Sequence, residues 1–377
     1  MNRILVLSYE FPPLGGGGAK VVAGLCHEFR ETGCEIDLVT MGFRGLPRRE
    51  EIEGIKIHRI PCIRIRKDVC YFPEMIPYIL IAIPYVLRLA RKGAYQVNHT
   101  HFIFPDGVIS WIVERMTGLP YVITAHGSDV PGYNPDRFHF LHRLLRPLWR
   151  AVTSRASRLV CPSRTLESLV LGRNPQARTA VIPNGIDLGK FDPHREREPR
   201  ILIVTRMFER KGVQFVLEAL RDLDLAYQVD IVGDGPYLET VQALARKYRS
   251  PARFHGFLEN KGPELRNLYE TASIFLFPSE SENFPIVLLE AMIAGIAIIT
   301  TRGTGCAEVV GDAALLVDPK SAQQIREAIL ELVENPALRA ELGRRARSRA
   351  EEQFGAKSVA QRMIRVLDEA SRAPSIR

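Results

Sequence analysis

The sequence has few of the features that mark a small secreted protein or a zinc protein. Its six cysteines include no C-x-x-C pair, so their spacing fits neither a zinc site nor a small disulfide framework. Scattered cysteines in a chain of this size are typical of buried thiols in a reducing cytosol. The amino terminus has only Ile4–Leu7 as an apolar stretch, which is too short for the core of a signal peptide. These absences predict a cytoplasmic protein.

Long hydrophobic runs are lacking as well. The longest, Met75–Leu87, has 13 residues and contains two prolines, whereas a membrane-spanning helix needs about 20 residues. We therefore expect no transmembrane segment. The sequence also shows no internal repeat and no low-complexity tract.

What the chain does contain is typical of a globular protein. Of its 377 residues, 46% are hydrophobic and 25% are charged, and this length corresponds to about two domains of roughly 100–200 residues. The net charge is +8, and all of it falls in residues 1–188, which carry 24 Lys and Arg against 16 Asp and Glu. Such an excess favours a phosphate-rich or membrane-surface partner, although a chance distribution over solvated faces also fits.

Short β-branched runs alternate with helical patterns along the whole chain, in two successive series. The expected strands are 3–7, 35–40, 55–60, 96–101, 121–124, 158–161 and 180–182, then 200–205, 228–232, 253–255, 274–277, 297–300 and 315–317. The expected helices include 19–31, 109–117 and 143–156, then 213–220, 237–248, 264–271, 285–294, 322–334 and 337–354. The pattern predicts an α/β protein of two doubly wound, Rossmann-like domains. A polar, proline-rich connector runs from Pro183 to Pro199.

Loops that follow strands are the places to look for chemistry, because open α/β sheets bind ligands at the carboxyl ends of their strands. After the first strand come four glycines, Gly15–Gly18, which either bring backbone N–H groups close to an anion or form a flexible turn. After the first strand of the second series come Arg206 and Lys211. Two cations before a helix suit a diphosphate, but a solvated charge cluster is the alternative.

The segment 279–291 follows a strongly apolar strand and contains Glu290 inside an otherwise apolar helix that opens at Pro285. A carboxylate there needs a partner, since burying it unpaired costs several kcal/mol. It lies about 7 Å along the helix from the free N–H groups of the first turn, which matches the reach from a nucleotide's phosphates to its ribose diol. An internal salt bridge is the alternative partner. His126 follows the strand 121–124 and is either a site residue or a structural histidine.

Taken together, these segments resemble the retaining glycosyltransferases of glycosyltransferase family 4, which have the GT-B architecture of two Rossmann-like domains facing across a cleft. The resemblance spans nearly the whole chain. The matching motifs are Pro12-Pro13 with the glycine run, His126-Gly127, 182–187 (Ile-Pro-Asn-Gly-Ile-Asp), Arg206 with Lys211-Gly212, 232–236 (Val-Gly-Asp-Gly-Pro), and the glutamate pair Glu282 and Glu290.

This resemblance implies transfer of a hexose-type sugar from a nucleotide-diphosphate sugar with retention of anomeric configuration. By similarity, the catalytic residues are His126, Arg206, Lys211 and Glu282. The donor-binding residues are Gly16, Gly17, Gly18, Gly233, Phe257, Leu258, Asn283, Phe284, Pro285, Ile286, Val287 and Glu290. Because two cations supply the positive charge, we expect no metal and no cofactor. The domains would be 1–185, joined by a C-terminal helix 355–377 that packs back on it, and 186–354.

The acceptor is expected to be lipid-linked or a polysaccharide or other glycan, handled by the basic N-terminal domain. Two segments there mix basic and apolar residues, 64–92 and 138–150, which is typical of binding to an anionic membrane surface. A buried helix with a basic outer face has the same composition. Three other functions remain open: a nucleotide-sugar 2-epimerase of the same architecture, a non-catalytic nucleotide-sugar-binding protein, and a nucleic-acid-binding module. The last has no supporting motif, so no nucleic-acid partner is expected.

Overall fold

A computed structural model describes residues 3–133, 144–260 and 262–373 of the chain. The chain divides into two compact units, which are described here one at a time. Unit 1 comprises Met1–Gly185 and Ala356–Arg377, and unit 2 comprises Ile186–Gly355. Gly355, which the sequence assigns to the C-terminal helical segment, belongs to unit 2, where it forms an isolated β-bridge with Ile186.

Unit 1 is built on one sheet with the strand order β3-β4-β2-β1-β5-β6-β7-β8. Each neighbouring pair is parallel except β3 and β4, which are antiparallel. The strands are β1 Arg3–Leu7, β2 Glu35–Met41, β3 Arg49–Ile52, β4 Ile55–Ile60, β5 Val97–His101, β6 Tyr121–Thr124, β7 Arg158–Cys161 and β8 Thr179–Val181. Continuous apolar runs such as β1 are buried because helices cover both faces of a parallel sheet.

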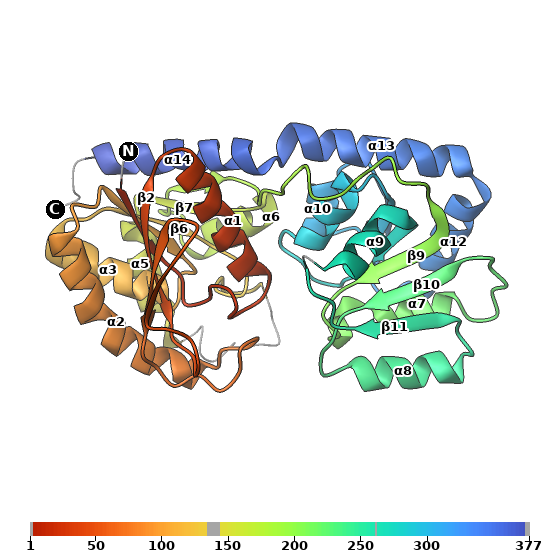
Figure 1. Ribbon diagram of the computed structural model, residues 1–377, viewed down its shortest axis with the longest axis horizontal. Helices are drawn as coiled ribbons and strands as arrows, with labels where there is room; N and C mark the ends of the chain where they lie inside the picture. The colour runs from red at the N-terminus through yellow and green to blue at the C-terminus, as the bar shows by residue number, and fades with distance from the viewer. Residues whose placement is uncertain (1–2, 134–143, 261, 374–377) are drawn as a thin grey trace. The chain divides into compact units, whose positions relative to one another are not determined.

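The described helices of unit 1 form a layer on each face of this sheet (Figure 1). They are α1 Gly17–Glu31, α2 Phe72–Lys92, α3 Asp106–Thr117, α5 Arg146–Arg155, α6 Arg164–Arg173 and α14 Ala356–Arg372. One core cluster joins α1 and α14 to the sheet, and a second joins α2, α3, α5 and α6 to its other face. Val359, Met363 and Leu367 of α14 are buried in the first cluster, so the C-terminal helix is part of unit 1.

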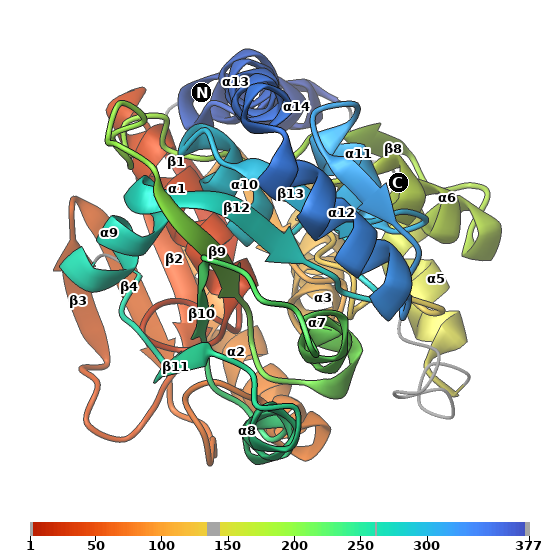
Figure 2. The same cartoon turned by 90° about the vertical axis from the view of Figure 1, so that its right-hand side faces the viewer.

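Unit 2 has a six-stranded parallel sheet in the order β11-β10-β9-β12-β13-β14. Its strands are β9 Glu198–Val204, β10 Gln228–Val232, β11 Ala252–Gly256, β12 Ala272–Phe277, β13 Ala297–Thr301 and β14 Leu315–Val317. Its described helices are η1 Glu209–Lys211, α7 Val213–Ala219, α8 Leu238–Lys247, α9 Pro263–Thr271, α10 Ile286–Ile293, α11 Gly305–Val310, α12 Ala322–Glu334 and α13 Pro336–Gln353. Figure 2 shows α7 and α8 near one side of this sheet, and α9, α10 and α11 contribute to the core cluster on the other. The predicted fold class, two doubly wound Rossmann-like sheets, is confirmed.

The argument that the apolar run of α2 is too short to cross a membrane was wrong. The 13-residue apolar run lies inside a helix of 21 residues, Phe72–Lys92, with Pro77 and Pro84 within it. By length and composition alone this helix is long and apolar enough to cross a membrane, and 28% of its most apolar window is buried within the protein. The length argument against a spanning helix therefore fails. One face of α2 nevertheless packs into the core of unit 1 through Tyr78 and Val86.

Candidate active site

The two motifs predicted to bind the donor in unit 2 meet at the point where the strand order of the sheet reverses. The chain runs outward from β9 through β10 to β11 on one side, and through β12 to β14 on the other. Such a reversal is where doubly wound sheets bind their ligands, at the carboxyl ends of the strands. Residues 205–212 follow β9, and residues 278–285 follow β12. The topology therefore brings Arg206 and Lys211 to the segment that contains Glu282.

Direct contacts join these two loops. The backbone N–H of Glu280 donates to the carbonyl oxygen of Arg210 at 2.8 Å. The ammonium group of Lys211 forms an ion pair with Glu282, and the hydroxyl of Ser279 donates to the same carboxylate oxygen at 2.7 Å. The side chains of Lys211 and Glu282 are 13% and 11% exposed, so this pair is shielded from solvent and stays electrostatically strong.

Arg206 lies on the same loop, five residues before Lys211. Its guanidinium carbon is 4.9 Å from the ring centroid of Phe208, a stacked arrangement that holds the planar group in place. The residue is exposed at the surface of unit 2. The loop thus presents one exposed and one shielded cation.

Glycines allow the loops at this end of the sheet to pack backbone to backbone. A Cβ atom on Gly233, just after β10, would lie 1.7 Å from the carbonyl oxygen of Thr205. Gly212, part of the Lys211-Gly212 motif, has such a role too, since its Cβ would meet the Pro278 carbonyl at 2.2 Å. Sequence reasoning missed Gly305 in the first turn of α11, whose Cβ would meet the Asn283 carbonyl at 1.7 Å. The structure thus gives Gly233 a packing role, while its predicted donor contact stays a prediction.

The helix α10 begins just after the glutamate segment, with Pro285 at its N-cap. Asn283 and Phe284 are buried, and the Phe284 ring packs edge-on against Phe354 at 5.5 Å. The N–H groups of the first helical turn have no partners within a helix, and this turn includes Ile286 and Val287. The buried side chains therefore fix a turn whose N–H groups suit an anion.

Glu290 already has partners within unit 2. Its carboxylate is 3% exposed, forms an ion pair with Lys190 and accepts a hydrogen bond from the Tyr269 hydroxyl at 2.9 Å. With its amide group turned, Asn260 also donates to this carboxylate at 3.1 Å. The internal salt bridge, which the sequence left as an alternative, is therefore present. Binding of the ribose by Glu290 stays a prediction, and an incoming diol would share or displace these contacts.

Sequence reasoning missed Lys190, although the need for a partner was visible in the sequence. A carboxylate inside an apolar helix requires a cation or several hydrogen bonds. The partner stands 100 residues earlier in the chain, in the connector. No local spacing connects the two positions, so only the fold identifies Lys190.

The predicted base-binding residues follow β11, the edge strand of the sheet. Gly256 ends this strand with a φ of +67°, and the next side chain, Phe257, is 73% exposed. Leu258 packs against the core cluster around α9 and α10. The loop is thus anchored by one side chain and presents the other to solvent.

In unit 1, the glycine run and His126 come together around Phe102. The run follows β1, and α1 begins at Gly17 with Gly16 as its N-cap. A Cβ atom on Gly18 would lie 2.9 Å from Cζ of Phe102 and 3.5 Å from Nδ1 of His126, whereas one on Gly17 would meet nothing within 4 Å. Of Gly17 and Gly18, only Gly18 therefore lies where close approach excludes a side chain.

We expect Gly18→Ala to destabilise unit 1 and Gly17→Ala to leave its stability unchanged or raised. The new methyl at position 18 must displace Phe102, at a cost of about 1–3 kcal/mol. At position 17 an alanine meets no other atom and replaces a flexible glycine within a helix. This substitution is expected to raise the free energy of unfolding by roughly 0.5–1 kcal/mol. Urea unfolding of both variants measures this difference. Equal stabilities would show that the ring does not confine Gly18.

Buried carboxylates that the sequence did not single out hold the loops around His126. Asp129 accepts hydrogen bonds from the backbone N–H groups of His126 (3.0 Å), Gly127 (2.9 Å) and Ile103 (2.8 Å). Asp106 accepts from the Tyr9 backbone and the Tyr78 hydroxyl, each at 2.8 Å, and burial raises its pKa to about 8. These bonds fix the loops that follow β1, β5 and β6.

His126 itself is neutral. Burial lowers its pKa to about 3, and its Nε2 atom lies 3.1 Å from Nδ1 of His101. His126 and Gly16–Gly18 belong to unit 1, and all the other predicted site residues belong to unit 2. The basic segment 138–150 lies partly outside the described residues.

The chain contains one Asp-x-Asp triplet, Asp222-Leu223-Asp224, a pattern that can hold a divalent cation. It precedes β10 and so lies at the amino end of that strand, away from the loops described above. Asp222 is 83% exposed and pairs with Arg221. Within residues 3–133, 144–260 and 262–373, no group of three or more His, Cys, Asp or Glu side chains could hold a metal ion.

Solved structures of glycosyltransferases have the same fold. Sucrose-phosphate synthase from Thermosynechococcus elongatus matches with a TM-score of 0.84 and 21% identity, over 98% of this chain and 99% of its own. HepE from Anabaena, in complex with UDP and glucose, matches with a TM-score of 0.76 and 16% identity, over 98% and 100%. The chain therefore has the GT-B fold.

Comparison at the sequence level identifies the family. Residues 15–190 match the family Glycosyltransferase Family 4, and residues 189–349 match Glycosyl transferases group 1. A putative teichuronic acid biosynthesis glycosyltransferase from Bacillus subtilis is 28% identical over 298 residues, which are 75% of this chain and 72% of that protein. The chain belongs to the family 4 glycosyltransferases, as its motifs indicated.

Proposed function

We propose that this glycosyltransferase moves a hexose-type sugar from a nucleotide-diphosphate sugar to a lipid-linked or polysaccharide acceptor, with retention and without a metal ion. The observation that carries the proposal is the junction of the β9 and β12 loops in unit 2. There Lys211 pairs with Glu282 beside the first turn of α10, and Arg206 lies on the same loop. Cations and free N–H groups at one place suit a diphosphate leaving group.

The proposed reaction follows from where charge develops. The bond between the anomeric carbon and the donor's phosphate oxygen breaks, and its electron pair leaves with the nucleoside diphosphate. Arg206, Lys211 and the first turn of α10 stabilise that negative charge. The acceptor hydroxyl attacks from the same face, and the leaving phosphate oxygen takes its proton. Glu282 holds the Lys211 ammonium in place, and Glu290 binds the ribose.

The positive charge on the leaving-group side comes from side chains, which supports a reaction that needs no metal and no cofactor. The Gly16–Gly18 turn and His126 of unit 1 are assigned to the donor sugar and its phosphates. A cytoplasmic location fits the six cysteines, all of which are free thiols, since disulfides are rare in reducing compartments.

A panel of UDP-, GDP- and ADP-linked sugars, assayed for nucleoside diphosphate release with and without candidate acceptors, tests this proposal. UDP-glucose is the first donor to try, because HepE was solved with UDP and glucose. We expect release that depends on the acceptor and persists in EDTA. Conversion of the free donor sugar to its C2 epimer would instead indicate the 2-epimerase, and binding without release a non-catalytic protein. Complete loss of release in EDTA would overturn metal independence.

We further propose that unit 1 docks on an anionic membrane through one exposed surface, which we call the α2 surface. Six large apolar side chains within nineteen consecutive residues are exposed, up to 72%. They are Ile63, Ile65, Tyr71, Ile76, Leu80 and Ile81. The helix ends in three cations, Arg88, Arg91 and Lys92. An apolar helical stripe with flanking cations suits insertion among anionic headgroups, and the net charge of residues 1–188 has the matching sign.

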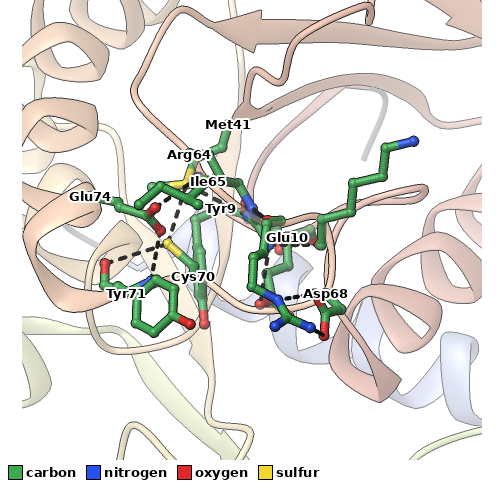
Figure 3. A network of polar contacts seen from close by, with 12 residues as sticks. Tyr9, Glu10, Met41, Arg64, Ile65, Asp68, Cys70, Tyr71 and Glu74 are labelled. Carbon is green, nitrogen blue, oxygen red and sulfur yellow. Dashed lines mark hydrogen bonds and ion pairs between the residues drawn. The ribbon is translucent and has the colours of Figure 1, made fainter. Parts of the chain in front are cut away.

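Two buried charges hold the loop that carries half of this surface (Figure 3). Arg64 donates to the carbonyl oxygens of Tyr9 at 3.3 Å and Lys67 at 3.0 Å. Glu74 accepts from the backbone N–H groups of Ile65 at 2.8 Å and Tyr71 at 2.7 Å. Apolar side chains on a fixed loop lose little entropy on binding. This supports a preformed docking surface rather than a loose loop.

Leu80→Glu is expected to weaken binding to vesicles rich in phosphatidylglycerol by at least about tenfold. Burying one leucine contributes roughly 1.5–3 kcal/mol, which the substitution removes. Met116→Glu is the matched control, because Met116 is similarly exposed on α3 outside the α2 surface. Flotation of vesicles at low salt measures both. Absence of binding by the unsubstituted protein, or equal losses in both variants, would overturn the membrane proposal.

A further inference from the structure

Three histidine rings contact one another in unit 1 in a tilted row, which ends at His126 beside the glycine turn. His99 and His101 lie on β5, and His126 follows the neighbouring parallel strand β6. The ring centroids of His99 and His101 are 4.3 Å apart, and those of His101 and His126 are 5.3 Å apart. His99 and His101 are fully buried. Neither has an assigned role in the proposed reaction.

Hydrogen-bond accounting fixes which ring nitrogens carry hydrogens. His101 Nδ1 and His126 Nε2 lie 3.1 Å apart, so one of them must donate to the other. The second nitrogen of His101, Nε2, is buried and has no hydrogen-bond partner among the described residues. A neutral imidazole carries one N–H and one bare nitrogen. The buried nitrogen without a partner is therefore either an orphaned donor or an unused lone pair.

The arrangement in which Nε2 of His101 carries no hydrogen is lower in energy, because buried N–H groups without an acceptor are rarer in proteins than buried acceptors without a donor. His101 then carries its hydrogen on Nδ1 and donates it to Nε2 of His126. Protonation of both His101 nitrogens is opposed because burial, together with His99 and His126, lowers the pKa of His101 well below its usual value. His99 follows the same logic: its Nε2 lies 2.9 Å from the Thr124 hydroxyl, and its Nδ1 has no partner in the part of the chain that the structure describes.

This arrangement determines what His126 offers to a ligand. With Nε2 accepting from His101, the hydrogen of the neutral ring is on Nδ1. That atom lies beside the glycine turn, 3.5 Å from the place where a Cβ on Gly18 would be. We propose that His101 is a positioning residue that fixes the Nδ1–H form of His126, so that His126 presents a neutral hydrogen-bond donor to a hydroxyl oxygen of the donor sugar. The contact with the sugar rests on the proposed function; the tautomer does not.

The tautomer has a direct readout in the ligand-free, full-length protein. With ¹⁵N-labelled histidine, long-range ¹H–¹⁵N spectra near neutral pH distinguish protonated from bare ring nitrogens. A His126→Gln variant assigns the signals. We expect His126 to be protonated on Nδ1, whereas free histidine in water favours Nε2–H. A His126 ring protonated on Nε2 would overturn the proposal.

Three variants test the role of His101. His101→Phe keeps a ring but removes the donor that fixes the tautomer, so we expect both tautomers of His126 to be populated and kcat/KM for the donor to fall at least about twofold. His101→Asn can place an amide N–H where Nδ1 lies, and is expected to restore the Nδ1–H form and kcat/KM. His99→Phe, the matched control on the same strand, should change neither, because His99 does not hydrogen-bond to His126.

The outcomes separate the two claims. An unchanged tautomer in His101→Phe, or equal losses in His101→Phe and His99→Phe, would overturn positioning by His101. Full turnover by His126→Gln would overturn the contact between His126 and the donor sugar. If the unsubstituted protein also shows the Nδ1–H form of His126, the assignment of the tautomer would remain valid. If His101→Phe does not fold, the spectrum of the unsubstituted protein still decides the tautomer.

Discussion

Lys211→Ala is expected to lower kcat by about 10²–10³-fold, which corresponds to the loss of one fixed group that stabilises transition-state charge. The ammonium of Lys211 is held by Glu282 at the junction of the β9 and β12 loops, where the leaving diphosphate is proposed to lie. Glu282→Ala should lower kcat strongly as well, because it releases that ammonium. Steady-state kinetics with the active donor measure both effects.

The control for this prediction is Lys320→Ala. Lys320 also pairs with a glutamate of the β12 loop, Glu280, but its side chain is 63% exposed. Exposed pairs contribute little, so kcat should stay within about twofold of the unsubstituted value. Circular dichroism checks that every variant is folded. Near-normal turnover by folded Lys211→Ala or Glu282→Ala would contradict the assignment of this site.

The second large effect concerns stability. Lys190→Met is expected to lower the free energy of unfolding by about 3 kcal/mol, because it leaves the carboxylate of Glu290, 3% exposed, without its cation. Removing one partner of a buried ion pair typically costs about 3–5 kcal/mol of stability. Because Glu290 keeps its hydrogen bond from Tyr269, we expect a loss at the lower end of that range. Urea unfolding measures the loss.

A double variant separates loss of the ion pair from loss of packing. Lys190→Met combined with Glu290→Gln should recover most of the stability, since a neutral amide needs no cation and still accepts from Tyr269. Arg195→Met is the matched control: Arg195 is half-exposed and pairs with Glu270, which Arg266 also contacts, so less than about 1 kcal/mol should be lost. A loss as large in this control, or no recovery in the double variant, would show that the Lys190–Glu290 pair is not the cause.

Most strands were predictable because a parallel sheet covered on both faces produces continuous apolar runs. β1, β4, β6, β7, β10 and β14 have the predicted bounds. β3 was missed because its sequence, Arg-Glu-Glu-Ile, is polar and short, as an edge strand can be. The length of α2 was underestimated because only its apolar run of 13 residues was counted, whereas the helix has 21 residues and continues through both prolines.

The candidate site was predictable where its residues follow strands. The carboxyl ends of neighbouring parallel strands meet at one edge, so Lys211 and Glu282 could be expected near each other from their places in the chain. Partners outside that rule were not predictable. Lys190 in the connector and His101 inside β5 act through contacts across the fold, and no spacing in the sequence reveals which polar groups they complete.

The central claim, retaining transfer from a nucleotide-diphosphate sugar, is tested most directly by following one reaction by ¹H NMR. The anomeric proton of the transferred sugar and the released nucleoside diphosphate are observed together, with the active donor and acceptor. We predict that the product has the anomeric configuration of the donor and appears in equal amount with the nucleoside diphosphate. An inverted product, or a C2 epimer of the sugar without transfer, would contradict the account.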